Sequence, residues 1–411
     1  MGSVRLKMLK PGMVLADDVR DVKGRLLLMK GRPVGMEHIR IFKMWGIPQV
    51  EIMGAPGEGE PVPAPPVDPC RLRAVTRETE ALFAGTDREH PAIQEIFQQA
   101  VAHRAACRYP IAVPDLPAEV PLPDAGARPS DFLEKFIERD LALPEIPSIV
   151  FELNEVIANP LSTADQMAQV INKSPSLTAL LLKIVNSSFY GLPSKVDRVS
   201  LAVTLIGTRE LSALALGISV LSIFKNIPKS LLNMQSFLQH SLACGIVSRL
   251  LAARKSLRQT EQMFTAGLLH DLGRLILFIH FPAEALAVLR LSLSTATCLY
   301  AVEKQQLGCD HTAIGRYLLN RWRLPLMLEN TVAFHHSPSE APDPVPPAIV
   351  HVADILVNAL GLGTSGERRV PPLDPRAWDV LELPVDSFEV IVKQGVNQLN
   401  TLAFLLQDKP L

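Results

Sequence analysis

Hydrophobic residues recur at intervals of three and four along most of the chain from Ser130 onward. This period puts apolar side chains on one face of a helix, so it predicts helices through the larger part of the sequence. Two helix starts are marked by residues that cap free N–H groups, Thr163 and Ser174, the latter followed by a proline suited to the first turn. A last group of helices is expected over 375–407. The pattern predicts an all-helical main body.

The first fifty residues show short apolar runs separated by turns. "MVLADDV" and "RLLLM" are expected to be strands joined by a hairpin turn at Lys23-Gly24. "GMEHIRIFKMWG" is expected to be a helix that ends at Gly46, and "IPQVEIM" a returning strand. These elements predict a small α/β unit, which would need support from a neighbouring part of the chain.

Proline-rich passages divide the chain into segments. The first, "GAPGEGEPVPAPPVDP", holds six prolines and three glycines and predicts a semi-extended linker. The predicted order is an α/β unit over 1–53, a linker over 54–69, a helical segment over 70–108, a second linker over 109–129, a main helical domain over 130–340 and a helical extension over 341–411.

Composition supports helices and narrows the choice of partners. Hydrophobic residues make up 48% of the chain and aromatic residues only 5%, which favours packed helices over sheets. Lys plus Arg (41) balances Asp plus Glu (42), so DNA binding is not expected. The longest apolar run, 211–224, is too short to cross a bilayer, so no membrane partner is expected. Five cysteines without a CxxC spacing, and a start without an apolar signal region, predict a cytoplasmic protein with reduced thiols.

Histidine and aspartate residues interrupt several apolar helical stretches. Burying an isolated His or Asp in a dry core costs several kcal/mol of stability. A divalent ion offsets that cost, because imidazole and carboxylate bind Zn, Fe or Mn well. The candidate metal ligands are His240, His270, Asp271, His311, His335, His336 and Asp354.

The stretch "GLLHDLGRLIL" (267–277) is the most informative of these. Neighbouring side chains on a helix diverge by about 100°, so His270 and Asp271 can reach one ion only where a helix bends or ends. Gly273 offers a place for such a bend. Arg274, about one turn further, is expected to face the same cavity, where a guanidinium can bind a phosphate with two hydrogen bonds.

A structural interpretation competes with each of these assignments. A single histidine on an apolar helix is more often a hydrogen-bonded core residue than a ligand, and Asp354 could equally cap a helix or form an ion pair. The site could also be empty, with its histidines satisfying one another. His270-Asp271 taken together with His335-His336 favours a present or ancestral metal site. The structural interpretation is preferred for His38, His90, His103, His280 and His351.

The order of these residues resembles that of the HD superfamily of metal-dependent phosphohydrolases, in which a metal ion activates a water that attacks a phosphate ester. The chain is more similar to the related HDOD domains of bacteria over about 132–340. The matching stretches are "LPEIPSIVFELNEVI", "KSPSLTALLLKIVNSSFYG", "VSLAVTLIGTRELSALAL", "GLLHDLGRLIL", "EKQQLGCDHTAIGRYLLNRWRLP" and "HHSP". The first fifty residues resemble the unit that precedes some HD-GYP cyclic di-GMP phosphodiesterases, which implies a link to second-messenger signalling.

The resemblance assigns the candidate ligands to one or two ions of Fe, Mn or Zn. Carried over from HD-GYP proteins, His240, His270, Asp271 and Asp354 would surround one ion. His311, His335 and His336 would surround a second.

The sequence also departs from the HD-GYP pattern. No Gly-Tyr-Pro and no "DGSG" loop follow His336, Arg274 stands where a lysine is common, and Ser236 stands where some members carry a metal-binding glutamate. The resemblance therefore implies retained ligands without the substrate-recognition loop. HDOD proteins are mostly regarded as regulatory modules without demonstrated catalysis.

We therefore expect a cytoplasmic bacterial signal-transduction protein that binds another protein or a nucleotide, and the sequence favours this interpretation over an enzyme without deciding between them. The alternative is a phosphohydrolase acting on a nucleotide or cyclic dinucleotide, with Asp271 and Arg274 as catalytic residues. Phe189 and Tyr190, in "VNSSFYG", are expected to fill the junction between two helical halves, and less readily to form a partner-binding surface.

Overall fold

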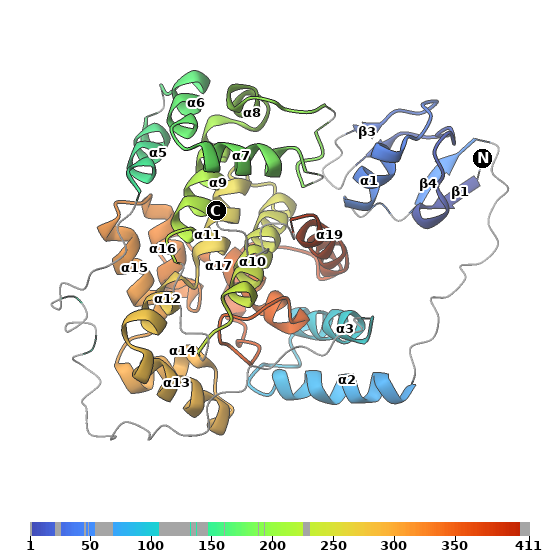
Figure 1. Cartoon of the computed structure of the whole chain (residues 1–411). Coiled ribbons are helices and arrows are strands. Elements are labelled where there is room, and N and C mark those ends of the chain that lie inside the picture. The colour runs from blue at the N-terminus through green and yellow to red at the C-terminus, as the bar shows by residue number, and fades with distance from the viewer. Residues whose placement is uncertain are drawn as a thin grey trace.

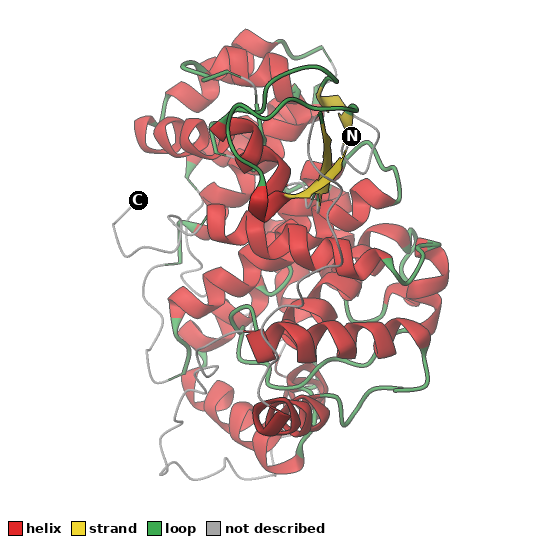
Figure 2. Cartoon of the chain, turned by 90° about the vertical axis from the view of Figure 1, so that its right-hand side faces the viewer, coloured by secondary structure: helices red, strands yellow, loops and turns green. Residues whose placement is uncertain are grey.

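The computed structural model describes residues 2–20, 26–44, 47, 49–53, 69–106, 132, 137, 147–159, 161–187, 189–192, 194–224 and 231–402. Helices dominate, and the described strands all belong to the first fifty-two residues (Figure 2). This confirms the predicted fold class, a mainly α protein that begins with a small α/β unit.

The N-terminal unit contains two antiparallel strand pairs. Strand β1 pairs with β4, with Val4 opposite Val50, and β2 pairs with β3. The elements are β1 (Gly2–Arg5), η1 (Leu6–Met8), β2 (Val19–Arg20), β3 (Leu26–Leu28), α1 (Met36–Met44) and β4 (Gln49–Ile52). The predicted turn at Lys23-Gly24 and the predicted helix end at Gly46 lie outside the described residues.

The structure of this unit differs from the prediction in two places. Strand β1 was not predicted, because its four residues show no alternation. The run 13–19 does not form one continuous strand. Val14 and Leu15 make single bridges to Pro33 and Ile52 instead, and a proline cannot donate to a longer ladder. The unit has a core that includes Leu15 and Phe42, and α1 packs against α19 of the main body (Figure 1).

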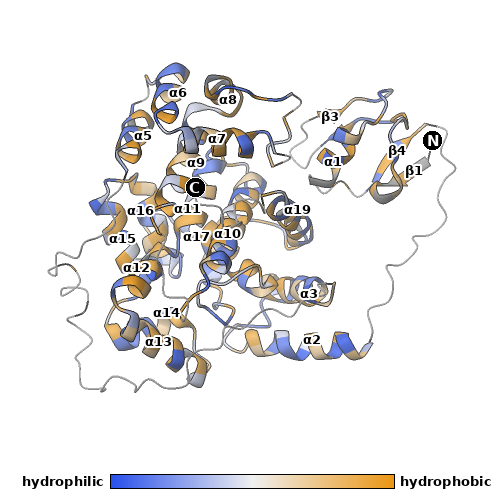
Figure 3. Cartoon of the chain, viewed as in Figure 1, coloured by the Kyte–Doolittle hydropathy of each residue, from blue (hydrophilic) through white to orange (hydrophobic). Residues whose placement is uncertain are grey.

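Two helices follow the first proline-rich passage, α2 (Pro69–Leu82) and α3 (Pro91–Ala106). Polar and apolar residues alternate along α2 (Figure 3), and its partner α3 contacts α17 and α19. Phe83 packs edge-on against Phe97, with ring centroids 5.3 Å apart. These contacts attach the segment to the main body.

The first half of the main body is a group of short helices that pack on one another. They are α5 (Ser148–Ala158), α6 (Ala164–Asn172), α7 (Pro175–Val185), α8 (Val199–Ile206) and α9 (Thr208–Leu221). Thr163 and Gln166 form a reciprocal capping box at the start of α6. Ser174 accepts from the N–H of Leu177 at 3.3 Å at the start of α7. Both predicted helix starts are confirmed.

The stretch after α7 joins this half to the next. Phe189 is fully buried, and its ring centroid is 5.7 Å from that of Phe264 on α11. The Tyr190 hydroxyl donates to Glu261 at 2.9 Å, and Glu261 also pairs with Arg249. The interpretation of Phe189 and Tyr190 as a junction between halves is confirmed, and the partner-surface alternative is wrong because both side chains are buried.

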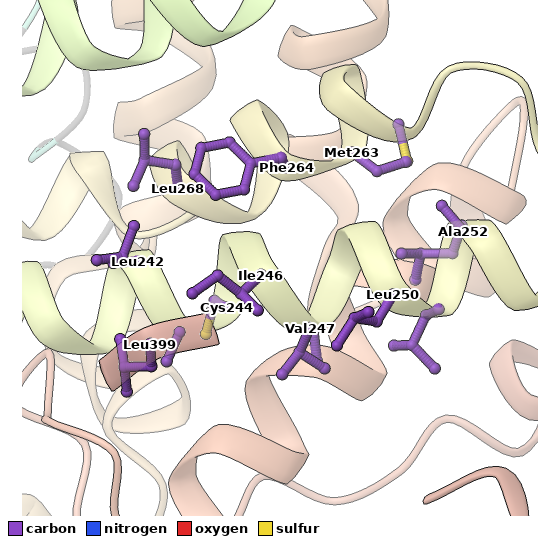
Figure 4. Close-up of a cluster of buried hydrophobic side chains, with 14 of the residues drawn as sticks. Leu242, Cys244, Ile246, Val247, Leu250, Ala252, Met263, Phe264, Leu268 and Leu399 are labelled. Atoms are coloured by element: carbon purple, nitrogen blue, oxygen red, sulfur yellow. The ribbon is translucent and has the colours of Figure 1, made fainter. Parts of the chain in front are cut away.

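The second half is built around α10, which packs against α11, α17 and α19. Apolar residues of α10 and α11, among them Leu242, Val247 and Phe264, form one cluster (Figure 4). The helices are α10 (Met234–Arg254), α11 (Thr260–Leu269), α12 (Leu272–His280), α13 (Pro282–Thr295), α14 (Leu299–Leu307), α15 (His311–Arg321), α16 (Leu326–Phe334), α17 (Val345–Leu360), α18 (Pro375–Leu381) and α19 (Ser387–Thr401), with a short helix η3 (Pro338–Glu340).

Within the described part of the chain, no single helix is both long and apolar enough to span a membrane. Two sharply bent helix pairs, 199–221 and 260–295, meet the length and composition requirement together.

Candidate metal centre

A break between two helices presents His270 and Asp271 to the interior. His270 ends α11, and Asp271, with φ −95° and ψ 15°, separates it from α12. The predicted helix break is therefore present, but the expected role of Gly273 is wrong. Gly273 lies inside α12, where a Cβ would collide with the backbone of His311 and approach the Gly315 nitrogen to 2.8 Å. A glycine stands there because α15 packs directly on α12.

Four other helices bring the remaining candidates to the same place. His240 is on α10, His311 begins α15, and His335-His336 follow α16. Asp354 lies in the middle of α17, so the helix-cap interpretation of this residue is wrong. His240, His270, His311 and His335 are fully buried, and Asp271 and Asp354 are 2% and 4% exposed.

Four side chains meet at one point, the first donor group, made of His240, His270, Asp271 and Asp354. The Nε2 atoms of the two histidines are 3.4 Å apart. Asp354 Oδ1 lies 3.2 Å from His240 Nε2 and 3.5 Å from His270 Nε2. Asp271 Oδ2 lies 3.6 Å and 3.2 Å from the same two atoms.

The other oxygen of Asp271 faces a second donor group, with His311, His335 and His336. Asp271 Oδ1 is 3.0 Å from His311 Nε2 and 4.0 Å from His335 Nε2. The Nε2 atoms of His311 and His335 are 3.4 Å apart, and His336 places a ring nitrogen within 4.8 Å of a nitrogen of each. One carboxylate therefore joins the two groups.

Hydrogen bonds on the outer side of the His270 and His335 rings orient these two side chains. Nδ1 of His270 bonds the carbonyl of Gly267 at 2.8 Å, and Nδ1 of His335 bonds that of Val332 at 2.8 Å. Because a carbonyl only accepts, these Nδ1 atoms carry the proton and the inward Nε2 of a neutral ring keeps its lone pair. Such outer hydrogen bonds are the usual support of metal-binding histidines.

Glu303 supports His311 in the same way. It lies 2.6 Å from His311 Nδ1 and also accepts from the backbone N–H of His311 at 2.9 Å. Arg274 Nε is 3.3 Å from the same ring nitrogen. A protonated Nδ1 cannot accept from Arg274, and its contact with Glu303 is much shorter. Arg274 therefore pairs with Glu303, whose Oε1 is 3.4 Å from Nε.

The spacing of the first donor group fits a divalent ion. Tetrahedral ligands at about 2.0–2.2 Å from an ion lie roughly 3.3–3.6 Å from one another. The distances between its imidazole nitrogens and carboxylate oxygens run from 3.2 to 3.6 Å. His240 Nδ1, on the outer side of its ring, has no hydrogen-bond partner within the described structure. The side chains therefore do not satisfy one another fully, and both donor groups contain the chemistry to hold a metal.

The carboxylates dominate the electrostatics. Burial lowers the pKa of His270, but Asp271 and Asp354 outweigh burial and raise it to about 10. Burial and the nearby His270 and His311 lower the pKa of His335 to about 3. Burial raises the pKa of Asp271, but Arg274 and the protonated imidazoles hold it well below its usual value. Asp271 and Asp354 are therefore ionised, and their carboxylates can serve as anionic ligands.

Arg274 faces the same interior, as expected, and has internal partners. Its side chain is 2% exposed, and its Nη1 lies 3.2 Å from Asp271 Oδ2 and donates to the Ser365 hydroxyl at 2.5 Å. Ser365 belongs to the segment 361–370 after α17, which also bonds the start of α10 through the Thr364 N–H and the carbonyl of Ser236 at 3.2 Å. The guanidinium is therefore held between Asp271, Glu303 and Ser365.

Sequence reasoning missed three neighbours of this centre: Cys244, Glu303 and Ser365. Cys244 lies one turn after His240, and its Sγ is 3.6 Å from His240 Nε2. Burial and the two carboxylates raise its pKa well above the usual value. The one-turn spacing from His240 was a usable signal, whereas nothing in the local sequence marks Glu303 or Ser365.

The remaining histidines behave largely as expected. His351 bonds the carbonyl of His335 through Nδ1 at 2.8 Å and accepts from the N–H of Asp374 at 2.9 Å. His38 and His90 accept from nearby backbone N–H groups. These assignments as structural histidines are confirmed. The Nε2 of His280, in contrast, has no hydrogen-bond partner in the described structure.

Comparison with known proteins identifies the domain. The family model of the HDOD domain matches residues 143–338. An uncharacterized protein of Treponema pallidum (strain Nichols) is 27% identical over 214 residues, which are 51% of this chain and 41% of the relative. The chain thus covers less than half of that relative's length. The family-model match ends at residue 338, before Asp354 and Ser365, although both residues contact the centre.

Solved structures share the fold. An HDOD domain protein of unknown function from Geobacter sulfurreducens is 24% identical, with a TM-score of 0.52 over 67% of this chain and 92% of its own. A candidate phosphohydrolase from Shewanella amazonensis SB2B is 23% identical, with a TM-score of 0.53 over 67% of this chain and 98% of its own. A candidate signal-transduction protein from Marinobacter aquaeolei VT8 is 19% identical, with a TM-score of 0.52 over 80% of this chain and 68% of its own.

The fold and the buried His/Asp side chains together define a mainly helical domain with a candidate metal centre. More particularly, the chain contains an HDOD domain, as the sequence resemblance implied.

Proposed function

We propose that this chain is a bacterial cytoplasmic signal-transduction module that acts by binding another protein or a nucleotide. Its buried centre would hold metal as a structural or regulatory element. The observation that carries this proposal is that Arg274 is buried and paired within the protein. Arg274, a cation beside the donors that could bind a phosphate, is 2% exposed and already paired with Asp271, Glu303 and Ser365.

The ligands we assign to the centre are the two donor groups joined by Asp271. Imidazole nitrogens and carboxylate oxygens suit Fe, Mn or Zn, one or two ions per chain. A bound ion would supply Lewis acidity there. Glu303 would keep His311 oriented, and the backbone carbonyls behind His270 and His335 would do the same for those rings.

The alternative is a metal-dependent phosphohydrolase that acts on a nucleotide or a cyclic dinucleotide. The observation that favours it is the bridging position of Asp271 between two groups of nitrogen donors. In that case Asp271 would hold both ions and Arg274 would bind the phosphate. Arg274 would first have to exchange Ser365 for the substrate, so the segment 361–370 would have to move.

Metal content and turnover measured on the same preparations distinguish the two. The full chain, purified without chelator or a metal-charged column, would be compared with His270→Ala and His335→Ala, and with His280→Ala as a control outside the donor groups. We expect one or two Fe, Mn or Zn per chain, retained in His280→Ala and reduced in the other two variants. Absence of stoichiometric metal in the wild type would refute the metal centre.

Hydrolysis is then tested with cyclic di-GMP and with a chromogenic phosphodiester. The regulatory proposal expects no turnover in the metal-loaded wild type and a lower melting temperature for Asp271→Ala. Turnover that Asp271→Ala abolishes without unfolding the chain would overturn it in favour of the hydrolase.

A further inference from the structure

Cys244 stands beside the first donor group, and no feature of the HDOD resemblance accounts for it. It is four residues after His240 on α10, so both side chains leave the same face of the helix, one turn apart. Its side chain is fully buried. Buried cysteines often act as small apolar residues, and Figure 4 shows Cys244 beside such neighbours. The direction of its sulfur separates the two roles.

The Sγ atom lies 3.6 Å from Nε2 of His240, the nitrogen that faces the donors. It is also within 4.8 Å of the ligand atoms of His270 and Asp354, and these four atoms form one mutually close set. A tetrahedral ion with sulfur at about 2.3 Å and nitrogen at about 2.0–2.1 Å separates these two ligands by about 3.6 Å. The distance from the sulfur to His240 Nε2 therefore fits a shared ion, and the ligand atoms of His270 and Asp354 are near enough to join it.

The backbone at Cys244 is held in place. A Cβ added to Gly267 of α11 would lie 2.7 Å from the carbonyl oxygen of Cys244, so the two helices touch backbone to backbone at this residue. The same Gly267 carbonyl accepts from Nδ1 of His270. One helix crossing thus positions the thiol and the imidazole together.

We propose that Cys244 is a sulfur ligand beside the first donor group, so that His240, Cys244, His270 and Asp354 would hold the ion, with Asp271 between this set and the second donor group. The proposal rests on the proposed metal centre and specifies its chemistry. As the sulfur binds, its S–H bond breaks and the proton leaves to solvent. A thiolate selects Zn, Fe(II) or Co(II) over Mn or Mg. Its added negative charge lowers the Lewis acidity of the ion, which suits a structural or regulatory site better than a hydrolytic one.

The test uses cobalt as a spectroscopic probe. The full chain is stripped of metal, loaded with Co(II), and compared with Cys244→Ser and Cys244→Ala, with Cys298→Ser as the control for another buried cysteine. Cobalt content is measured on each sample, and circular dichroism verifies folding. We expect a sulfur-to-cobalt charge-transfer band in the near ultraviolet for the wild type and for Cys298→Ser, and none for the two Cys244 variants.

Zinc competition provides a second measurement. We expect Zn affinity to fall about tenfold or more in Cys244→Ser, since loss of supporting groups alone costs 10–100-fold in metal sites, while Mn affinity changes little. Cobalt bound without the band in the wild type, or a band that persists in Cys244→Ser, overturns the sulfur ligand and leaves the metal centre intact. A wild type that binds no cobalt overturns both.

Discussion

Two glycines that pack against the same helix offer a sharp test of how the centre is positioned. Gly267 of α11 and Gly395 of α19 both lie in helix interiors, and both contact α10. Alanine is favoured over glycine by about 1 kcal/mol at such positions, so helix propensity alone predicts the same gain for both substitutions. Their surroundings predict opposite results.

A Cβ at Gly267 would lie 2.6 Å from Ser248 Oγ and 2.7 Å from the carbonyl oxygen of Cys244. Ordinary contact begins near 3.4 Å, so α11 would have to move from α10 by 3.4 − 2.7 = 0.7 Å. Overpacking of this kind costs about 1–3 kcal/mol. A Cβ at Gly395 would meet Val247 at 3.6 Å, an ordinary contact.

We therefore expect Gly267→Ala to lower the midpoint of urea unfolding and Gly395→Ala to leave it unchanged or raise it. Because the movement also separates His270 from His240, now 3.4 Å apart between their Nε2 atoms, Gly267→Ala should weaken metal binding as well. Unfolding followed by circular dichroism, with metal content measured in parallel, provides the comparison. A Gly267→Ala protein as stable as Gly395→Ala would refute the backbone contact between α10 and α11.

Three further changes address other parts of the fold. Tyr190→Phe should lower the free energy of unfolding by about 1.5–3 kcal/mol, because buried Glu261 loses a hydrogen bond, whereas Tyr317→Phe at the surface should change it little; equal effects in urea unfolding would contradict this. Thr163→Ala should cost about 1 kcal/mol through loss of the capping box, measured as a lower melting temperature, and no change would argue against that cap. Burial raises the pKa of Asp374, but hydrogen bonds from Ser339 and from the Arg376 N–H lower it overall, so the stability that Asp374 contributes is present above the unfolded pKa of 3.8 and is lost as pH falls from there through the folded pKa. The stability difference between wild type and Asp374→Asn should narrow below that pH, and a constant difference would exclude the linkage.

The local sequence was sufficient to predict those features that depend on neighbouring residues alone, namely the helices and two of their starts. The three- and four-residue spacing predicted the helices, and Thr163 and Ser174 marked two of their starts, because a hydroxyl satisfies the free N–H groups of its own first turn. Helical period also tells which residues share a face. Polar residues on apolar faces therefore identified the donors of the centre before their positions were known.

The helix break at His270-Asp271 was predicted from the divergence of adjacent side chains, but the role of Gly273 was not. Gly273 is required because the backbone of α15 packs directly against it. A contact between segments far apart in the sequence cannot be predicted from the residues around the glycine. The single-strand expectation for 13–19 failed for a related reason, since pairing depends on which strands lie alongside.

The sequence by itself determined the fold class and the residue types that can bind a metal, because both follow from the side chains and the helical period. Only the tertiary structure decided how those residues combine. It placed Asp354 of α17 beside His240 of α10, divided the two oxygens of Asp271 between the donor groups, and enclosed Arg274 between Glu303 and Ser365. These pairings depend on which helix faces pack together. Packing is a property of the whole set of helices, and no single stretch of the chain encodes it.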